Sequence, residues 1–425
     1  MSRINDYQRY GEYLQRELDA LDDGPYCEAD ARAVKRWVTK IDGSVTEGTI
    51  QTYLRNLRKT AERLDTPIVE LSEALMDEHV YDLRHNPEYG RGSDPGLSDG
   101  TIRNVEFVIR KLHTDLELSE WADDYELTPQ PDNNVRPEDM LKEEDIRALC
   151  DATKRLRDTA IIEFLSDTAA RLSMMATLRV KDVDLEGEVA TYTPNEDAAG
   201  LKGAPIHEYP LIDSRATLRS YLRNAHPRPN DPDAAFIHRL PGNGFELEER
   251  DGTVAPNTIR SLLNSIAADA GVDKPTNPHN FRHSAVTRMR REGYDRAEVE
   301  HRVHWSIDTD MWETYEHIAA EEHNQSIFEK AGILEPDEDT LDRTRRRCGN
   351  CTETVAPHHD YCPQCGDAVS RDAREVQDAA RDTTLDTIAE LEDRLERLKT
   401  RELHSHVDSR GDHVAPPSSS SSDDR

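Results

Sequence analysis

Five side chains between residues 171 and 315 could act together on a phosphodiester. His279 and Arg282 lie three residues apart in the run PHNFRHS. Arg171 stands upstream in TAARL, and Trp305 and Tyr315 follow downstream. Cleavage of a phosphodiester needs a nucleophile, stabilisation of charge and a proton donor for the leaving oxygen. A tyrosine hydroxyl can attack, guanidinium groups bind phosphate oxygens as forks, histidine can move a proton, and an indole offers one N–H donor. These residue types suit phosphoryl transfer with a tyrosine as nucleophile.

The order and spacing of these residues resemble the catalytic half of the tyrosine recombinase, or phage integrase, family. That family places a first arginine in a T-G-x-R-I-x-E helix leading into L-x-W-x-D-I, followed by H-x-L-R-H, a second His or Trp, and the tyrosine. Here TAARL leads into LRVKDVD, Trp305 follows Arg282 by 23 residues, and Tyr315 follows Trp305 by ten. The resemblance covers residues 140–333 by motif. It implies a site-specific recombinase or integrase in which Tyr315 forms a 3′-phosphotyrosine, frees a 5′-hydroxyl and rejoins strands without ATP or a catalytic cofactor.

A lysine in a predicted hairpin matches a further feature of that family. Residues 189–193 and 206–211 flank a glycine-containing turn and are predicted to pair, and Lys202 is the only lysine between them. The family uses a lysine at this place as general acid, so the resemblance implies that role for Lys202. A flexible ammonium beside a phosphate suits proton donation to the leaving oxygen. The alternative is an ordinary solvated turn residue.

Two positions depart from the family pattern. Residues 173–174 are Ser-Met where Gly-Glu is common, so a usual supporting carboxylate is absent. His304 stands where a glycine is common, directly before the His/Trp position. His304 is therefore an alternative to Trp305 for that role, and Trp305 could instead be a core residue.

The elements that must position these residues are predicted to be mainly α-helical with a small antiparallel sheet. Residues 1–125 are predicted to be helical, because apolar residues recur there at helical spacing. The resemblance implies that these helices form the family's SAM-like core-binding, DNA-binding domain. The proline-containing stretch 126–139 is the expected linker, and residues 140–334 the tyrosine recombinase catalytic domain. Basic side chains on two N-terminal helices form a candidate DNA-binding surface, although such faces are often merely solvated: Arg55, Arg58, Lys59, Arg103, Arg110 and Lys111.

Four cysteines predict a zinc ribbon over residues 342–370. They form the pattern Cys-x2-Cys-x10-Cys-x2-Cys, made by Cys348, Cys351, Cys362 and Cys365. Two such knuckles suit tetrahedral thiolate coordination of a structural Zn²⁺. Gly349 and Gly366 are available for the tight turns. Two disulfides are the alternative, which a reducing cytosol disfavours.

A short coiled-coil helix and a disordered tail are expected after the ribbon. The helix is predicted over residues 376–403, where apolar residues follow the 3-4-3 spacing of a heptad seam: Ile388, Leu391, Leu395 and Leu398. Residues 404–425 end in APPSSSSSDDR and are predicted to be disordered. An assembly or DNA-contact module and a solubilising appendage are the two alternatives for this C-terminal part.

The overall charge is strongly acidic. Asp and Glu number 86 against 54 Lys and Arg, of which only 11 are Lys, and the net charge is −32. An acidic, lysine-poor surface resembles proteins of halophilic archaea. Acidity normally argues against DNA binding. At molar salt, however, the Debye length is about 3 Å, so only direct contacts count. No long apolar run and no apolar N-terminal segment stand in the sequence, so a cytoplasmic protein without a membrane partner is expected.

The predicted partners are double-stranded DNA and further copies of the chain, assembled as a tetramer on two duplexes, with no small-molecule substrate. The alternative function is a catalytically inactive DNA-binding regulator or architectural protein with the same fold and ribbon. A third possible function is that of an adaptor whose zinc ribbon and coiled coil recruit partners. The presence of all six candidate catalytic residues favours the enzyme. The sequence does not reveal the DNA target, nor whether the biological task is integration, excision or resolution of chromosome dimers.

Overall fold

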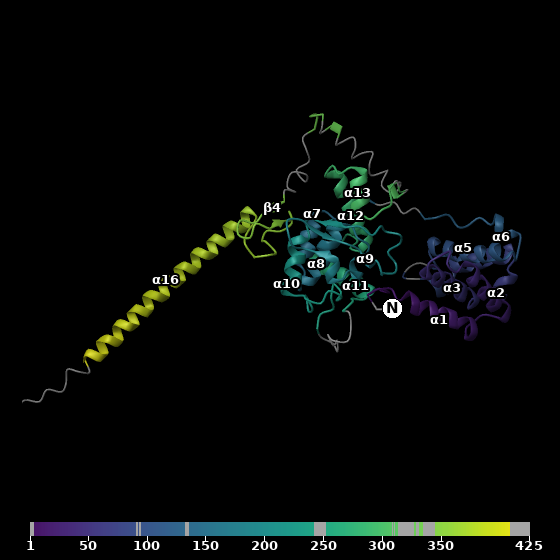
Figure 1. Cartoon of the computed structure of the whole chain (residues 1–425), viewed down its shortest axis with the longest axis horizontal. Helices are drawn as coiled ribbons and strands as arrows, with labels where there is room; N and C mark the ends of the chain where they lie inside the picture. Colours follow the sequence, from purple (N-terminus) through teal and green to yellow (C-terminus); the bar gives the residue numbers. More distant parts are fainter. Residues whose placement is uncertain are drawn as a thin grey trace, which may run out of the picture. The chain divides into compact units, whose positions relative to one another are not determined.

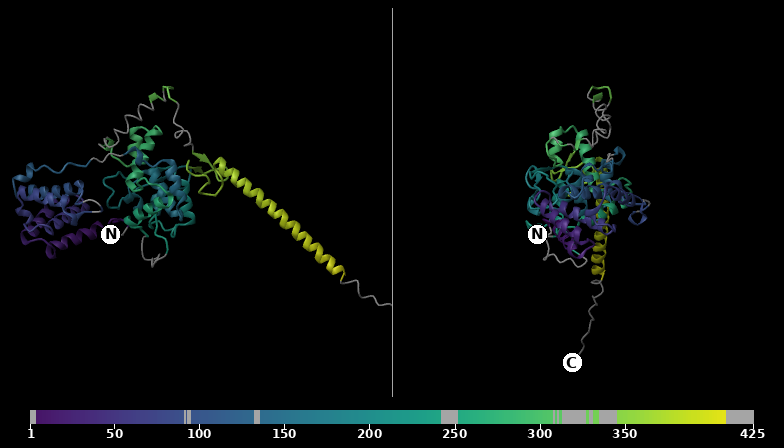
Figure 2. Two further views of the ribbon diagram at one scale, coloured as in Figure 1. Left: turned by 180° about the vertical axis from the view of Figure 1, so that it is seen from behind. Right: turned by 90° about the vertical axis from the view of Figure 1, so that its right-hand side faces the viewer.

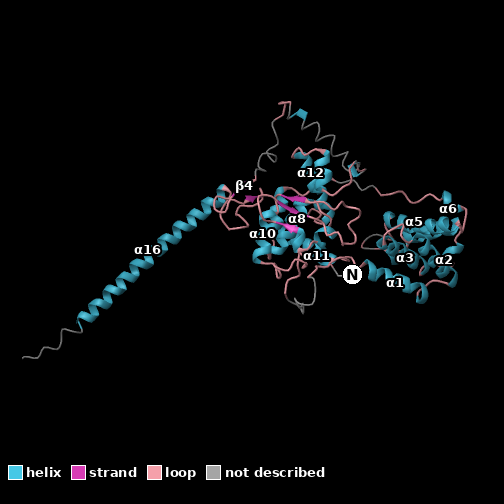
Figure 3. Ribbon diagram, viewed as in Figure 1, coloured by secondary structure: helices cyan, strands magenta, loops and turns pink. Residues whose placement is uncertain are grey.

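In the computed structural model, most of the regular secondary structure of the described residues is helical, and the described strands are few and short (Figure 3). The structure describes residues 4–90, 92, 95–131, 136–241, 252–307, 309, 311–312, 327–328, 331–334 and 345–408. Two units divide the chain, residues 1–344 and 345–425. Among the described helices, none is long and apolar enough to cross a membrane.

The first helices of the chain gather around a hydrophobic core of their own (Figure 1). They are α1 (Tyr10–Asp23), α2 (Glu28–Ile41), α3 (Glu47–Ala61), α4 (Glu73–His85), α5 (Asp99–Leu116) and α6 (Trp121–Asp124), with short 3₁₀ turns at Ile68–Glu70 and Pro87–Tyr89. The side chains of Thr46 and Ser72 cap α3 and α4 by accepting a backbone N–H from the first turn. Trp37, Leu54 and Leu57 are completely buried, which fixes the inward faces of α2 and α3.

A second set of helices surrounds α8 and carries the motif residues. They are α7 (Glu143–Asp151), α8 (Leu156–Thr168), α9 (Leu172–Thr177), α10 (Arg215–Asn224), α11 (Pro256–Ala270), α12 (Pro278–Arg291) and α13 (Arg296–Arg302), with 3₁₀ turns at Pro137–Asp139 and Val180–Asp182. Helix α8 is buried nearly all round, as its apolar run AIIEFL requires. Helices α7, α10 and α12 pack against it, so α8 is the central element of the region.

A three-stranded antiparallel sheet lies beside these helices. Its order is β1 (Val183–Asp184), β2 (Ala190–Tyr192) and β3 (Tyr209–Leu211). Strands β2 and β3 pair with Tyr192 opposite Tyr209, which confirms the predicted hairpin with shorter strands. The loop from 193 to 208 joins them and contains Lys202.

A buried carboxylate at the end of α8 ties this region together. Asp167 Oδ2 accepts hydrogen bonds from the backbone N–H of Ile212 (2.8 Å) and from the N–H and hydroxyl of Ser214 (3.1 and 2.8 Å). Its Oδ1 accepts from Arg302 Nη2 at 2.8 Å. Both charged side chains are nearly fully buried. One residue therefore links α8, the end of β3, the start of α10 and the end of α13.

The second unit contains the cysteine knuckles and one long helix. Strands β4 (Arg346–Arg347) and β5 (Thr354–Val355) pair antiparallel. Helix α16 (Arg371–Asp408) is a single continuous helix (Figure 2). It starts before the predicted residue 376, and it includes residues 404–408, so the expectation of disorder is wrong for that stretch. The four residues of the heptad seam are 47–57% exposed, so the described residues of this unit leave the seam uncovered.

Candidate active site

The first turn of α12 presents His279 and Arg282. The Asn277 side chain caps the helix by accepting the backbone N–H of His279 (3.0 Å) and of Asn280 (3.1 Å). Pro278 follows at the first helical position, where no N–H is needed. The Asn-Pro pair thus sets where α12 begins, and residues three apart lie on the same face of a helix. His279 is exposed, whereas Arg282 is only 5% exposed.

The guanidinium of Arg282 is held from two sides. Its Nη1 donates to the backbone carbonyl of Ala169 at 2.7 Å. Ala169 ends α8 in the left-handed conformation (φ 54°). The guanidinium carbon also lies 5.5 Å from the centre of the Trp305 ring, within the range of a cation–π contact. Trp305 is 5% exposed and packs in a core with residues of α12 and α13. In this arrangement the indole supports the arginine.

Arg171 directly precedes α9 as its N-cap residue. Its Nη1 lies 3.5 Å from the Leu201 carbonyl in the β2–β3 loop. Burial lowers the pKa of Arg171, and among the described residues no carboxylate offsets that effect. A guanidinium remains charged under these conditions. The half-buried cation is therefore available to an anionic ligand.

His279 is the residue on which several neighbouring cations act. Although the His279 side chain is partly open to solvent, surrounding protein still desolvates it, which lowers its pKa; four neighbouring cations lower it further: Lys202, Arg282, Arg171 and Arg260. Four of the six predicted catalytic residues are thus close enough to act on one another electrostatically. In a chain of net charge −32, such a concentration of positive charge indicates an anion-binding site.

Arg260 is the member of this group that the sequence did not reveal. It is an exposed residue of α11, and its Nη1 donates to Asn257 Oδ1 at 3.2 Å. An arginine on an amphipathic helix carries no motif, because a charged outer face is what any surface helix shows. Only the tertiary packing of α11, which contacts α7 and α9, places it near His279.

The alternative residue His304 faces a different set of neighbours. It is 2% exposed, adopts φ 61°, and its Nε2 shares a 2.5 Å hydrogen bond with the Tyr192 hydroxyl. The Tyr209 ring packs edge-on at 4.3 Å between ring centres. Burial, followed by Arg282, holds the pKa of His304 well below its usual value. His304 thus contacts the sheet, whereas Trp305 contacts Arg282. The assignment of Trp305 to the site remains a prediction.

Tyr315 lies outside the described residues. Residues 139–322, which include it, match the phage integrase family. Over 306 residues, the chain is 26% identical to the tyrosine recombinase XerD of Corynebacterium glutamicum, covering 68% of this chain and 93% of that protein. It is 24% identical over 239 residues to the tyrosine recombinase XerA of Pyrococcus furiosus, covering 55% and 76%. These relatives support the tyrosine recombinase family for this chain.

A solved structure agrees with the integrase match at the level of the fold. The crystal structure of a lambda integrase (75–356) dimer bound to a COC′ core site aligns with a TM-score of 0.50. It covers 67% of this chain and 94% of that chain, at 10% sequence identity. The likeness concerns the fold alone.

Most of the side chains proposed to bind DNA have partners within the integrase-like first unit. These contacts are Arg58 with Glu17 (2.6 Å), Arg103 with the Thr128 carbonyl (2.6 Å), Arg110 with the Tyr125 carbonyl (3.1 Å) and Lys111 with Asp115 (3.1 Å). Burial lowers the pKa of Lys59, and Arg55 lowers it further. Arg55 is exposed. The pair formed by Arg55 and Lys59 is therefore the best-placed part of the proposed surface, and the other four also stabilise the helices.

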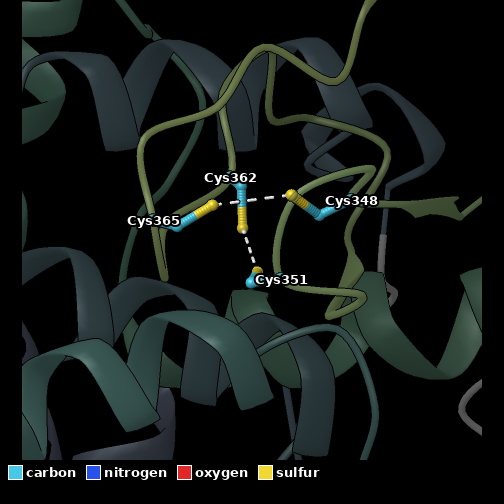
Figure 4. A group of neighbouring side chains, drawn as sticks. All are labelled: Cys348, Cys351, Cys362 and Cys365. Carbon is cyan, nitrogen blue, oxygen red and sulfur yellow. Dashed lines mark hydrogen bonds between the residues drawn. The ribbon is translucent and has the colours of Figure 1, made fainter.

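The four cysteine sulfurs of the second unit converge on one point (Figure 4). Cys348 and Cys365 have sulfurs 3.5 Å apart, Cys351 and Cys362 have sulfurs 3.6 Å apart, and all four lie within 4.8 Å of one another. A tetrahedral site with Zn–S bonds of about 2.3 Å has sulfur–sulfur edges of about 3.8 Å. A disulfide requires about 2.05 Å. The donor set therefore fits a tetrahedral metal and not two disulfides.

The two knuckle turns are closed by equivalent backbone hydrogen bonds. The N–H of Thr352 donates to the Cys348 carbonyl (3.0 Å), and the N–H of Gly366 donates to the Cys362 carbonyl (2.8 Å). Thr352 and Gly366, each directly after the second cysteine of its knuckle, take φ values of 63° and 77°. Both glycines lie within these turns, as expected, but only Gly366 takes a positive φ. The first knuckle places a β-branched residue in the left-handed region, at some cost in backbone strain.

Proposed function

We propose that this protein is a site-specific DNA recombinase or integrase that cleaves and rejoins double-stranded DNA through a 3′-phosphotyrosyl intermediate at Tyr315. One observation carries the proposal beyond the family match. Arg171 lies 3.5 Å from the Leu201 carbonyl, next to Lys202, and Arg282 donates to the Ala169 carbonyl, two residues before Arg171. These three cations lower the pKa of His279, and no described carboxylate opposes Arg171, although the chain is strongly acidic. A phosphodiester is the anion that these forked and flexible cations suit.

The chemistry follows from the residue types and their surroundings. Arg171 and Arg282 bind the nonbridging oxygens and stabilise the charge that grows on them. The Tyr315 hydroxyl attacks phosphorus, and its proton passes to His279, which burial and nearby cations keep neutral. The bond from phosphorus to the 5′ oxygen breaks, and that oxygen takes a proton from Lys202. Rejoining is the reverse reaction, so no ATP and no catalytic cofactor are required.

The decisive test uses a nicked duplex that loses a short fragment on cleavage, so that the covalent complex accumulates. We expect the wild-type protein to form an adduct that survives denaturant. Tyr315→Phe should bind the same DNA and form none, because only the hydroxyl is lost. The residues on either side are Thr314 and Glu316, so no adjacent tyrosine can take over the attack. A wild-type protein that binds DNA without any adduct would instead favour the inactive regulator.

We propose further that the second unit holds one structural Zn²⁺ and serves assembly. The four sulfurs offer a tetrahedral site, and the uncovered heptad seam of α16 offers a surface for another copy of the chain. The proposed working form is a tetramer on two duplexes. Truncation after residue 340 should leave adduct formation intact while recombination and tetramer assembly fall. Equal recombination by the truncated and full-length proteins would reduce the unit to an appendage.

A further inference from the structure

The loop that carries Lys202 is fixed on one side by α9. The hydroxyl of Ser173 donates to the Gly200 carbonyl at 3.1 Å, and Arg171 approaches the Leu201 carbonyl at 3.5 Å. Lys202 itself is exposed and adopts φ 53°. A left-handed backbone at a non-glycine residue needs surroundings that hold it in place. Near Lys202, the contacts from Arg171 and Ser173 reach residues 200 and 201, so they hold this side of the loop.

The other side of the loop is held by the first described residues of the chain. The backbone carbonyl of Asn5 accepts the N–H of Ala199 at 2.7 Å. The side-chain oxygen of Asn5 accepts from Asn195 Nδ2 at 3.2 Å. Asn195 is fully buried and also donates to the Thr177 carbonyl at the end of α9, at 3.0 Å. Asn195 therefore bridges α9 and the N-terminal segment.

Two tyrosines anchor this segment on the same part of the molecule. Tyr7 is 3% exposed and belongs to the hydrophobic core that includes residues of α8, α9 and the β2–β3 region. Tyr10, the first residue of α1, lies against Gly200, where an added Cβ would be 3.1 Å from Tyr10 Cε2. From Tyr10, α1 leads to the other N-terminal helices (Figure 1).

We propose that residues 4–10 form a strap that holds the Lys202 loop in its working position. Asn5 and Tyr7 are then positioning residues for the leaving-group proton donor, although neither touches the substrate. The reasoning is geometric. The strap contacts residues 195, 199 and 200, within seven residues of Lys202, and an ammonium on a flexible stem can serve as an acid only if its backbone stays near the phosphate. The inference rests on the proposed function.

The test separates loss of the proton donor from general damage. Its substrates are an ordinary nicked duplex and the same duplex with a bridging 5′ sulfur at the cleaved bond. A thiol, with a pKa of about 8.5, leaves as the anion and needs no acid. The variants are Tyr7→Ala, deletion of residues 2–8, and Lys202→Ala as reference. Gln15→Ala, at an exposed position on α1, is the matched control.

We expect the strap variants to cut the ordinary substrate at least about tenfold more slowly, in the manner of a lost general acid. With the sulfur substrate they should return to within threefold of wild type, as should Lys202→Ala. Gln15→Ala should match wild type on both. The deletion keeps the proposal falsifiable if Tyr7→Ala folds poorly.

Two outcomes would overturn the strap. One is unchanged cleavage of the ordinary substrate by both strap variants. The other is an equal loss on both substrates, which would mean that the segment supports the fold and not Lys202. Failure of the proposed function looks different, because the wild-type protein would then form no adduct on either substrate.

Discussion

Removal of the Asp167 carboxylate should loosen the whole region around α8. Asp167→Ala takes away the acceptor of three donors at Ile212 and Ser214 and leaves the Arg302 guanidinium buried without its carboxylate partner. The side chains of Asp167 and Arg302 are only 1% and 6% exposed, so water cannot replace the lost interaction. Breaking such a buried pair by removing one partner costs about 3–5 kcal/mol.

Hydrogen exchange read peptide by peptide measures this loss in the full-length chain. A loss of about 3 kcal/mol corresponds to about a hundredfold faster exchange through local opening. We expect that change in peptides from α8, α10 and α13, while peptides from α2 and α3 keep wild-type protection. The control is Glu186→Ala, which breaks an ion pair with Arg223 whose side chains are 73% and 49% exposed. An exposed pair is worth about 0–1 kcal/mol, so this variant should exchange almost as wild type.

The reasoning fails if Asp167→Ala leaves protection of α8 and α13 within threefold of wild type. It also fails if Glu186→Ala has an equal effect, because burial would then not be the factor that decides the cost.

Three further predictions concern the site, the pH response and the metal. Arg171→Ala and Arg282→Ala should each slow adduct formation by about a hundredfold or more, since one such donor is worth about 3 kcal/mol. A lysine at either position should restore only part of the lost rate. Rates of either Ala variant within threefold of wild type would contradict the assignment. His79 has its pKa lowered to about 4, by burial first and by Arg63 second. Between pH 6.5 and 4 the unfolded chain therefore binds a proton that the folded chain does not, and the free energy of unfolding should fall by up to about 3 kcal/mol as the pH drops. Urea titrations of wild type and His79→Leu at pH 7 and 4.5 measure this; an identical pH dependence would count against it. Purified protein should contain one zinc per chain by atomic absorption. Cys362→Ser should lower that content and expose residues 345–370 to protease without abolishing the covalent adduct. Full zinc content in that variant would refute the thiolate site.

The sequence was most informative where function depends on short spacing. Residues three apart, such as His279 and Arg282, must share a face of a helix, and the Asn-Pro pair before them marks where that helix begins. The hairpin around Lys202 and the four-cysteine cluster follow from equally local patterns. Such features depend on neighbours in the chain, so a single sequence reveals them.

The missed features all depend on contacts between distant residues. Asn5 meets Asn195 across 190 positions, and no periodicity records that approach. Arg260 and Asp167 are unremarkable in type and spacing, and only tertiary packing brings Arg260 near His279 and Asp167 against Arg302. The basic N-terminal residues show the opposite effect. Their charge suggests DNA, but Arg58 and Arg103 are partly occupied by acceptors in their own domain.

The single continuous helix at the C-terminus also sets a length scale. Its 38 residues rise about 1.5 Å each and so extend over about 57 Å, the length of about 17 base pairs at 3.4 Å per step. The seam begins at Ile388, 17 residues into the helix, so whatever binds there stands about 26 Å from the first turn of α16. Helix α16 therefore separates the heptad seam, which begins near its middle, from the cysteine knuckles that precede its first turn. Removing seven residues before the seam would keep the seam on nearly the same side of the helix and draw it inward by about 10 Å. Removing five would turn it by more than a quarter of a circle. In the assembly proposed above, the length of α16 would therefore set both the distance and the direction of the other copy from the first turn of this helix.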